Sequence, residues 1–208
     1  MLNNLGMAYG RQQKPEAIEC FEQALAIYRD LGDVRGESRA ATNVANAYFD
    51  LGRFEDALEA AQRSLEIQRR AGKRYGEGIA LGVIGGACRE LGRFSEAIEY
   101  LREALAIFRE LDDRMTEADA LSDLGQAYLG LNQVEDAVGS LSQSLIIWQD
   151  IGDRYGQAAT LQRLARAQEL VGEQKKAHDS LEQALRLFEE LGDDAHAAEI
   201  RRHLRQIG

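Results

Sequence analysis

The strongest constraint on the fold is an internal repeat with a period of 40 residues. The segment LGRFEDALEA at 51–60 recurs as LGRFSEAIEY at 91–100 and LNQVEDAVGS at 131–140, and a more divergent copy, VGEQKKAHDS, follows at 171–180. A period in this range indicates stacked units that each contact their neighbours, not one domain with a single central core. Two apolar positions stay in register through these copies without insertion: Ala57, Ala97, Ala137, Ala177 and Leu65, Leu105, Leu145, Leu185.

Within each period the apolar residues follow the spacing of one buried helix face. In the first copy these residues are Ala17, Ile18, Phe21, Ala24, Leu25, Tyr28 and Leu31. Leu-Gly-Asp ends this helix at 31–33 and 191–193, and Ile-Gly-Asp ends it at 151–153. The Gly favours the left-handed conformation there, and the Asp can cap the next helix. A second stop follows at Leu51-Gly52 and Leu91-Gly92, and at the third copy Asn132 replaces the Gly. Each period is therefore expected to be a helical hairpin, here called helix A followed by helix B.

Composition supports an all-α fold. The chain has 30 alanines and 26 leucines but only six valines and three threonines, and Pro15 is its one proline.

Helix A carries a column of small residues that lets helices approach closely, and beside it a column of larger residues that fills the space between hairpins. The small column is Gly6, Ala45, Gly85, Gly125 and Ala165, and the large column is Leu5, Val44, Ile84, Leu124 and Leu164.

The pattern of small residue, Tyr and Leu-Gly turn resembles the tetratricopeptide repeat (TPR). The small residue and the Tyr are seen at Gly6/Tyr9, Ala45/Tyr48 and Gly125/Tyr128, whereas the other two copies have Cys88 and Gln168 at the position of the Tyr. The usual unit has 34 residues. The period of 40 is similar to a longer subclass found in kinesin light chains, spindle-orientation adaptors and bacterial nucleotide-binding (NB-ARC/STAND) regulators.

The resemblance implies a right-handed α–α superhelix, a TPR solenoid, of five helical hairpins plus a C-terminal capping helix. We expect a single array over residues 1–208, with a cap at 193–208. Its repeats are expected at about 1–32, 33–72, 73–112, 113–152 and 153–192.

The first helix A is short, because only eight residues precede its Tyr at position 9. An array that opens halfway through a helix, with the apolar Leu2 and Leu5, is expected to follow another repeat in a longer protein. Its open N-terminal end is then a candidate for self-association.

Net charge, uncharged stretches and cysteine content indicate which partners and which cellular compartment to expect. A net charge of -10 and a pI near 4.9 argue against nucleic-acid binding. The uncharged stretch at 78–88 and the longer one at 137–149 are both too short to cross a membrane, so no membrane partner is expected. Cys20 and Cys88 are isolated, which favours a reducing compartment and a cytoplasmic location.

No catalytic or cofactor-binding motif is recognisable. The sequence has no G-x-x-x-x-G-K-S/T loop, H-E-x-x-H or C-x-x-C, and its three histidines have no set of metal ligands around them. The glycines at 82, 85 and 86 are interpreted as packing positions rather than a phosphate loop, and Cys20, Cys88 and Trp148 as core. We therefore expect a protein that is not an enzyme and needs no metal or cofactor.

The TPR resemblance implies a concave groove lined by the helix A residues that flank the packing columns. Asn recurs mid-helix at Asn4 and Asn43, although Asn is a poor helix former, and its amide can both donate to and accept from an extended peptide. The alternative is a merely solvated face. Arg11 belongs to the same set of helix A residues that flank the packing columns. The candidate peptide-binding residues are Asn4, Met7, Arg39, Asn43, Asn46, Phe49, Ile79, Val83, Arg89, Asp119, Asp123, Gln126, Arg163 and Arg166.

These residues favour a ligand with a basic segment facing Asp119 and Asp123 and an apolar anchor facing Ile79 and Val83. The leading hypothesis is a non-catalytic protein–protein interaction scaffold that binds a peptide or partner domain in this groove, as the sensor or autoinhibitory arm of a larger signal-transduction regulator. The alternative is a free-standing adaptor or cargo-binding module.

Overall fold

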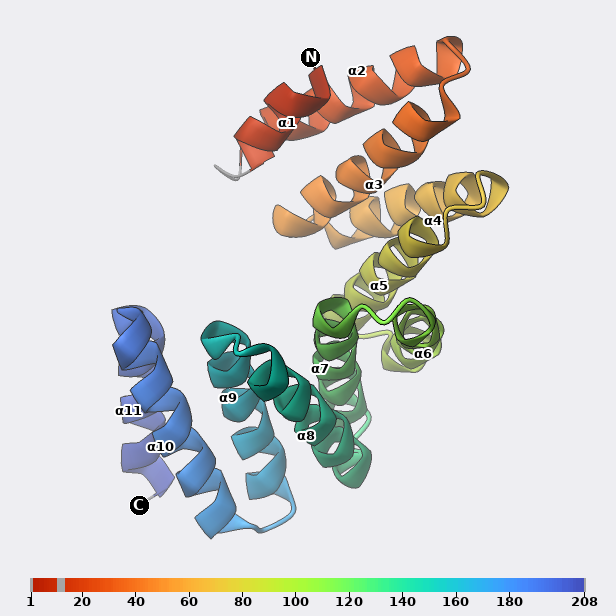
Figure 1. Ribbon diagram of the computed structural model, residues 1–208. Coiled ribbons are helices and arrows are strands. Elements are labelled where there is room, and N and C mark those ends of the chain that lie inside the picture. The colour runs from red at the N-terminus through yellow and green to blue at the C-terminus, as the bar shows by residue number, and fades with distance from the viewer. Residues whose placement is uncertain (1, 11–13, 208) are drawn as a thin grey trace. The chain divides into compact units, whose positions relative to one another are not determined.

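The computed structural model describes residues 2–10 and 14–207, and all regular structure in that part of the chain is α-helical (Figure 1). The all-α prediction is confirmed. By its internal contacts the chain divides into two compact units, which are described one at a time: unit 1, residues 1–111, and unit 2, residues 112–208.

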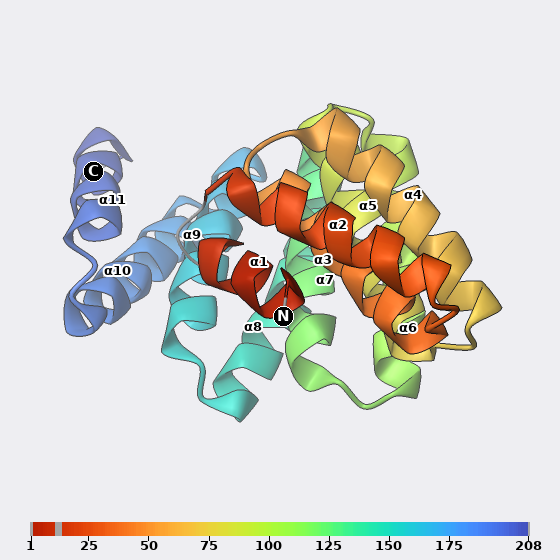
Figure 2. The ribbon, with the colours of Figure 1, turned by 90° about the horizontal axis from the view of Figure 1, so that it is seen from above.

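In unit 1 each helix packs against the next helix in the chain, so that α1/α2, α3/α4 and α5/α6 form three hairpins. Figure 2 shows the short α1 lying along α2. Helix α3 also contacts α5, which brings the first helices of two neighbouring hairpins together. The helices of unit 1 are α1 (Leu2–Gly10), α2 (Glu16–Asp30), α3 (Val34–Asp50), α4 (Phe54–Arg70), α5 (Arg74–Glu90) and α6 (Phe94–Glu110).

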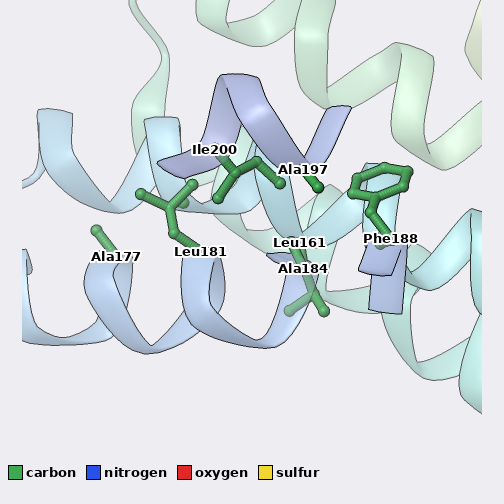
Figure 3. Packing of buried hydrophobic residues seen from close by; sticks show 9 residues of the cluster. Leu161, Ala177, Leu181, Ala184, Phe188, Ala197 and Ile200 are labelled. Atoms are coloured by element: carbon green, nitrogen blue, oxygen red, sulfur yellow. The ribbon is translucent and has the colours of Figure 1, made fainter. Parts of the chain in front are cut away.

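Unit 2 contains two hairpins, α7/α8 and α9/α10, and a further helix, α11, that packs on α10. Leu181 on α10 and Ile200 on α11 are fully buried and point toward one another (Figure 3). The helices of unit 2 are α7 (Arg114–Gly130), α8 (Val134–Ile151), α9 (Arg154–Leu170), α10 (Gln174–Leu191) and α11 (Asp194–Ile207).

The turns follow the predicted stop signals. Gly is left-handed at 32, 52, 92, 152 and 192, and Asn132 takes the same conformation with φ of 57°. Asp112, for which no such conformation was predicted, is also left-handed, with φ of 54°. The predicted Asp caps are present as well: the side chains of Asp33 and Asp153 accept hydrogen bonds from the amides of Gly36 (3.0 Å) and Gly156 (2.7 Å).

The small column of helix A is needed for close packing, as predicted. A Cβ atom at Gly85 would lie 2.6 Å from Cγ of Leu101, and one at Gly125 would lie 2.6 Å from Cγ of Leu141. These contacts leave no room for a side chain. In the large column Ile84 is fully buried, whereas Leu5 in α1 is exposed.

Other sequence interpretations also hold. Cys20, Cys88 and Trp148 are buried, and the two cysteines are free thiols. Gly86 lies against Phe49, with 3.0 Å between the ring and the position a Cβ would take, so it is a packing position. The same interpretation is wrong for Gly82, because no atom lies within 4 Å of the position its Cβ would take. None of the described helices is both long enough and apolar enough to span a lipid bilayer.

Candidate functional site

The predicted groove residues lie on the odd-numbered helices, and these helices bond to one another directly. In unit 1 the Asn43 amide on α3 donates to Oδ1 of Asn3 on α1 at 3.0 Å. In unit 2 Arg163 on α9 donates to Oγ of Ser122 on α7 at 2.7 Å. The two pairs occupy the same repeat positions. We call the surface that these helices present in each unit the odd-helix face.

The odd-helix face of unit 1 contains a pocket of about 470 Å³ between the first turns of α3 and α5, called the α3–α5 pocket. Two predicted groove residues, Arg39 and Asn43, line it. Its floor includes Gln68 from the end of α4, which is only 2% exposed. The remaining lining residues are Arg35, Ser38, Thr42, Gly72, Lys73, Arg74, Tyr75 and Gly76.

Unit 2 has a pocket of about 430 Å³ between α9 and α11, called the α9–α11 pocket. The predicted residues Arg163 and Arg166 line it, and Phe188 from the end of α10 contributes to its floor. The ring of His196 stacks on Phe188 with 4.8 Å between ring centroids. The other lining residues are Tyr155, Ala159, Gln162, Glu199 and His203.

The two pockets are built from equivalent positions three periods apart. Asn43 corresponds to Arg163, and Gln68 corresponds to Phe188. The repeat therefore creates the same kind of hollow at these two places. The residues that differ between them set the chemistry: the α3–α5 pocket has four cationic residues and a Gln at its floor, whereas the α9–α11 pocket combines Arg, His and Glu with the aromatic ring of Phe188 at its floor.

The other predicted residues of unit 1 line neither pocket. Asn4 and Met7 are exposed on α1, and Ile79 and Val83 are half-buried on α5. Asn46, Phe49 and Arg89 are also half-buried. The Asn46 side chain makes no hydrogen bond within the described residues. The Phe49 ring packs edge-on against Phe54 at 5.5 Å between ring centroids, and Arg89 forms an ion pair with Glu90 at 2.9 Å. Arg11 lies outside the described residues.

In unit 2 the acidic pair on α7 has an unusual electrostatic setting. Asp119 and Asp123 lie one turn apart, and Asp123 accepts a hydrogen bond from Gln126 at 3.3 Å. Part of the Asp119 side chain is open to solvent, yet desolvation by the surrounding protein is the largest cause that raises its pKa to about 6. The charge of Asp123 raises the pKa further, and Arg163 opposes this. A cationic group placed beside Asp119 would relieve the repulsion.

We expect Asp119→Asn to raise the melting temperature at pH 7 and to change it much less at pH 4. Folding raises the pKa of Asp119 from 3.8 to about 6, so the folded state holds the proton more tightly than the unfolded state does. The free energy of unfolding therefore falls as pH rises between these values, and the penalty is complete above pH 6. Thermal unfolding at both pH values measures the effect, with Asp179→Asn on exposed α10 as control. Equal melting at pH 7 would show that Asp119 is not under electrostatic strain.

Several pocket residues were missed at the sequence level. Arg35, Lys73 and Tyr75 lie in first turns or caps of helix A, outside the mid-helix row that the resemblance implied. Two departures from the repeat could have indicated them. Lys73 stands where other copies have a capping Asp, and Gln68 stands in a column otherwise occupied by the aromatic residues Tyr28, Phe108, Trp148 and Phe188.

The described residues offer one group of side chains with metal-ligand spacing, away from both pockets. His178, Asp179 and Glu182 on α10 have ligand atoms within 4.8 Å of one another. Asp179 and Glu182 are exposed, and Arg186 also pairs with Glu182 at 3.6 Å. Exposed acidic groups of this kind are common on helices, so the group is not treated as a site.

Antiparallel hairpins that recur every 40 residues and present pockets between their first helices define a helical-repeat protein. The tetratricopeptide repeat pattern matches residues 1–70, 36–110, 76–145 and 116–190, and the chain belongs to the tetratricopeptide repeat family. No match was found among curated protein sequences.

Solved structures show the same fold. Kinesin light chain TPR-like repeats from Podosopora anserina are 22% identical with a TM-score of 0.74, over 92% of this chain and 95% of that one. A signal transduction ATPase (STAND) with a TPR sensor from Pyrococcus horikoshii is 18% identical with a TM-score of 0.82, over 96% of this chain and 31% of that one. A Rap protein complexed with competence and sporulation factor is 21% identical with a TM-score of 0.70, over 99% and 62%. Repeats of this fold are typically protein-interaction scaffolds and generally not catalytic.

Proposed function

We propose that the protein is a non-catalytic scaffold that binds a peptide or a partner domain on its odd-helix face. The observation that carries this proposal is the recurrence of a pocket at equivalent positions of the two units, each lined by residues predicted for the groove. Hollows of this size suit the side chains of an extended peptide. Asn46 adds an amide with no partner among the described residues.

We further propose that the array is the sensor or autoinhibitory arm of a larger regulator. The likeness to a STAND protein with a TPR sensor and to a Rap protein bound to competence and sporulation factor supports this reading. A free-standing adaptor is the second candidate, favoured by the kinesin light chain repeats, which the chain matches over 95% of their length. A nucleotide-binding P-loop module in the same polypeptide would favour the regulator.

On the odd-helix face of unit 2 the ligand is a basic segment. Asp119 and Asp123 repel one another, and the charges of Asp113 and Asp153 also raise the pKa of Asp119, whereas Arg163 lowers it. Because the local field is negative, a Lys or Arg side chain of the ligand is attracted to this point. Binding there also lowers the pKa of Asp119, so affinity should increase as pH rises through about 6.

The test uses short peptides with a fixed central arginine, selected from a random display library on the purified chain. Binding of the best labelled peptide is measured by fluorescence anisotropy at low and high salt. We expect Asp119→Lys/Asp123→Lys to weaken binding by about tenfold or more at low salt and less at high salt, because exposed charges are screened.

The matched control is Glu135→Lys/Asp179→Lys, which makes the same charge change at exposed positions on α8 and α10. We expect this variant to bind within about twofold of wild type at either salt concentration. An equal loss in both double variants would mean that only net charge matters. Unchanged binding by Asp119→Lys/Asp123→Lys would place recognition away from α7, and either result contradicts the proposal.

A further inference from the structure

The α3–α5 pocket is a basic site on an acidic protein. Arg35, Arg39, Lys73 and Arg74 all line it, and none of its described lining residues is acidic, although the chain has a net charge of -10. Such a concentration of positive charge around one hollow attracts anions.

Three of the four cations are available to a ligand. Arg74 is already paired, with Glu77 at 3.0 Å and with Glu110 at 2.8 Å. Arg35 and Lys73 have no ion pair within the described residues, and Arg39 has one long hydrogen bond to the Tyr28 hydroxyl, at 3.4 Å. The pocket therefore presents three positive charges that are not neutralised by neighbouring side chains.

The helix that opens into this pocket also lacks its usual cap. In α3, α7 and α9 the N-cap is an Asp whose side chain accepts an amide hydrogen bond from the first turn. In α5 the N-cap is Lys73, which makes no such bond, and the Gly76 amide that Asp would satisfy lies at the pocket wall. An anion bound here would replace the missing carboxylate.

The pocket floor is polar and differs from that of the other copies. Gln68 is buried at a position that is aromatic in the other copies, and its amide donates to the Ser38 carbonyl and the Thr42 hydroxyl, both at 2.8 Å. The Ser38 hydroxyl donates back to Gln68 at 2.5 Å. This network fixes polar groups beneath the cations, whereas the equivalent α9–α11 pocket has the aromatic ring of Phe188 in this place.

We propose that the α3–α5 pocket binds a phosphate group carried on a peptide segment of a partner protein. A phosphorylated side chain carries a charge of about -1.5 to -2 and three acceptor oxygens. These match the two guanidinium groups, the ammonium group and the uncapped amide better than a single carboxylate does. The proposal rests on the proposed use of the odd-helix face for peptide binding, but it concerns unit 1 and a ligand of opposite charge.

The test compares three peptide pools that have the same degenerate flanks and a fixed centre of phosphoserine, serine or glutamate. Binding to the full chain is measured by fluorescence anisotropy, with inorganic phosphate as competitor. We expect the phosphoserine pool to bind about tenfold or more tightly than the other two, and inorganic phosphate to displace it. Equal binding of the glutamate pool, or binding of inorganic phosphate without any preference for the phosphopeptides, would overturn the proposal.

The decisive variant is Lys73→Asp, because it separates ligand binding from folding. It installs the capping residue of the other copies, so the melting temperature should rise by about 2–4 °C, while the preference for phosphoserine should be lost. Arg39→Gln should also reduce that preference, and Lys175→Asp on exposed α10 is the charge-matched control expected to retain it. Retained preference in Lys73→Asp would contradict the proposal.

Failure of this proposal can be told apart from failure of the scaffold proposal. The arginine-centred peptide should bind Lys73→Asp as it binds wild type, since its site is on α7. Loss of the phosphoserine preference alone therefore identifies the α3–α5 pocket, whereas simultaneous loss of both ligands would show a common site and refute the assignment of phosphate to this pocket.

Discussion

Replacing Leu105 with Asp is expected to lower the free energy of unfolding of unit 1 by about 3–5 kcal/mol. Leu105 on α6 is 6% exposed and belongs to the leucine column that recurs every 40 residues. The substitution removes a buried leucine and places a carboxylate among apolar side chains, where it must be desolvated or take up a proton. Urea unfolding followed by circular dichroism measures the loss.

The neighbouring residue provides the control. Ala106 is exposed on the same helix, so Ala106→Asp should change the free energy of unfolding by no more than about 0.5 kcal/mol. If both substitutions were equally destabilising, or if Leu105→Asp unfolded like wild type, the assignment of buried and exposed faces on α6 would be wrong.

The second large effect is a contrast between two glycines in α5. Gly85→Ala should destabilise the protein by about 1–3 kcal/mol, because its Cβ would lie 2.6 Å from Cγ of Leu101 and 3.3 Å from the backbone oxygen of Ala97. Gly82→Ala should stabilise it by up to about 1 kcal/mol, because nothing lies within 4 Å of that Cβ and Ala is the better helix former.

Each substitution adds one methyl group to the same helix. Thermal and urea unfolding of both variants measure the two changes in stability. Changes of the same sign would contradict it. Two destabilised variants would indicate that α5 is more crowded at Gly82 than the structure shows, and two stabilised variants would indicate that α5 and α6 do not pack closely at Gly85.

The sequence predicts the helices well because their determinants are local and repeated. A left-handed residue after helix B and an Asp cap before helix A recur at fixed spacing, and each acts within one turn of chain, so both could be placed before the structure was known. Asp112 was missed because Asp has no strong preference for the left-handed conformation. The position follows from the period, but the residue type gives little indication.

The site was predicted only in part, because the pockets arise from contacts between hairpins. The TPR resemblance indicates the helices that line both pockets, and it includes Arg39 and Arg163, but it gives no reason to extend the site to the first turn of the next helix A. Asn43 was interpreted as a free amide for a ligand, whereas it also holds α3 to α1 through Asn3. That bond joins two different repeat columns, so comparing residues within a column does not reveal it.

Amide chemical-shift mapping with the selected arginine-centred peptide tests binding to the odd-helix face most directly. If the protein binds ligands there, the peptide will shift resonances of α7 and α9, with the largest changes around Asp119, Asp123 and Arg163. Shifts confined to α8 and α10, with α7 and α9 unperturbed, would show that ligands bind the opposite side of the hairpins and would contradict the proposed function.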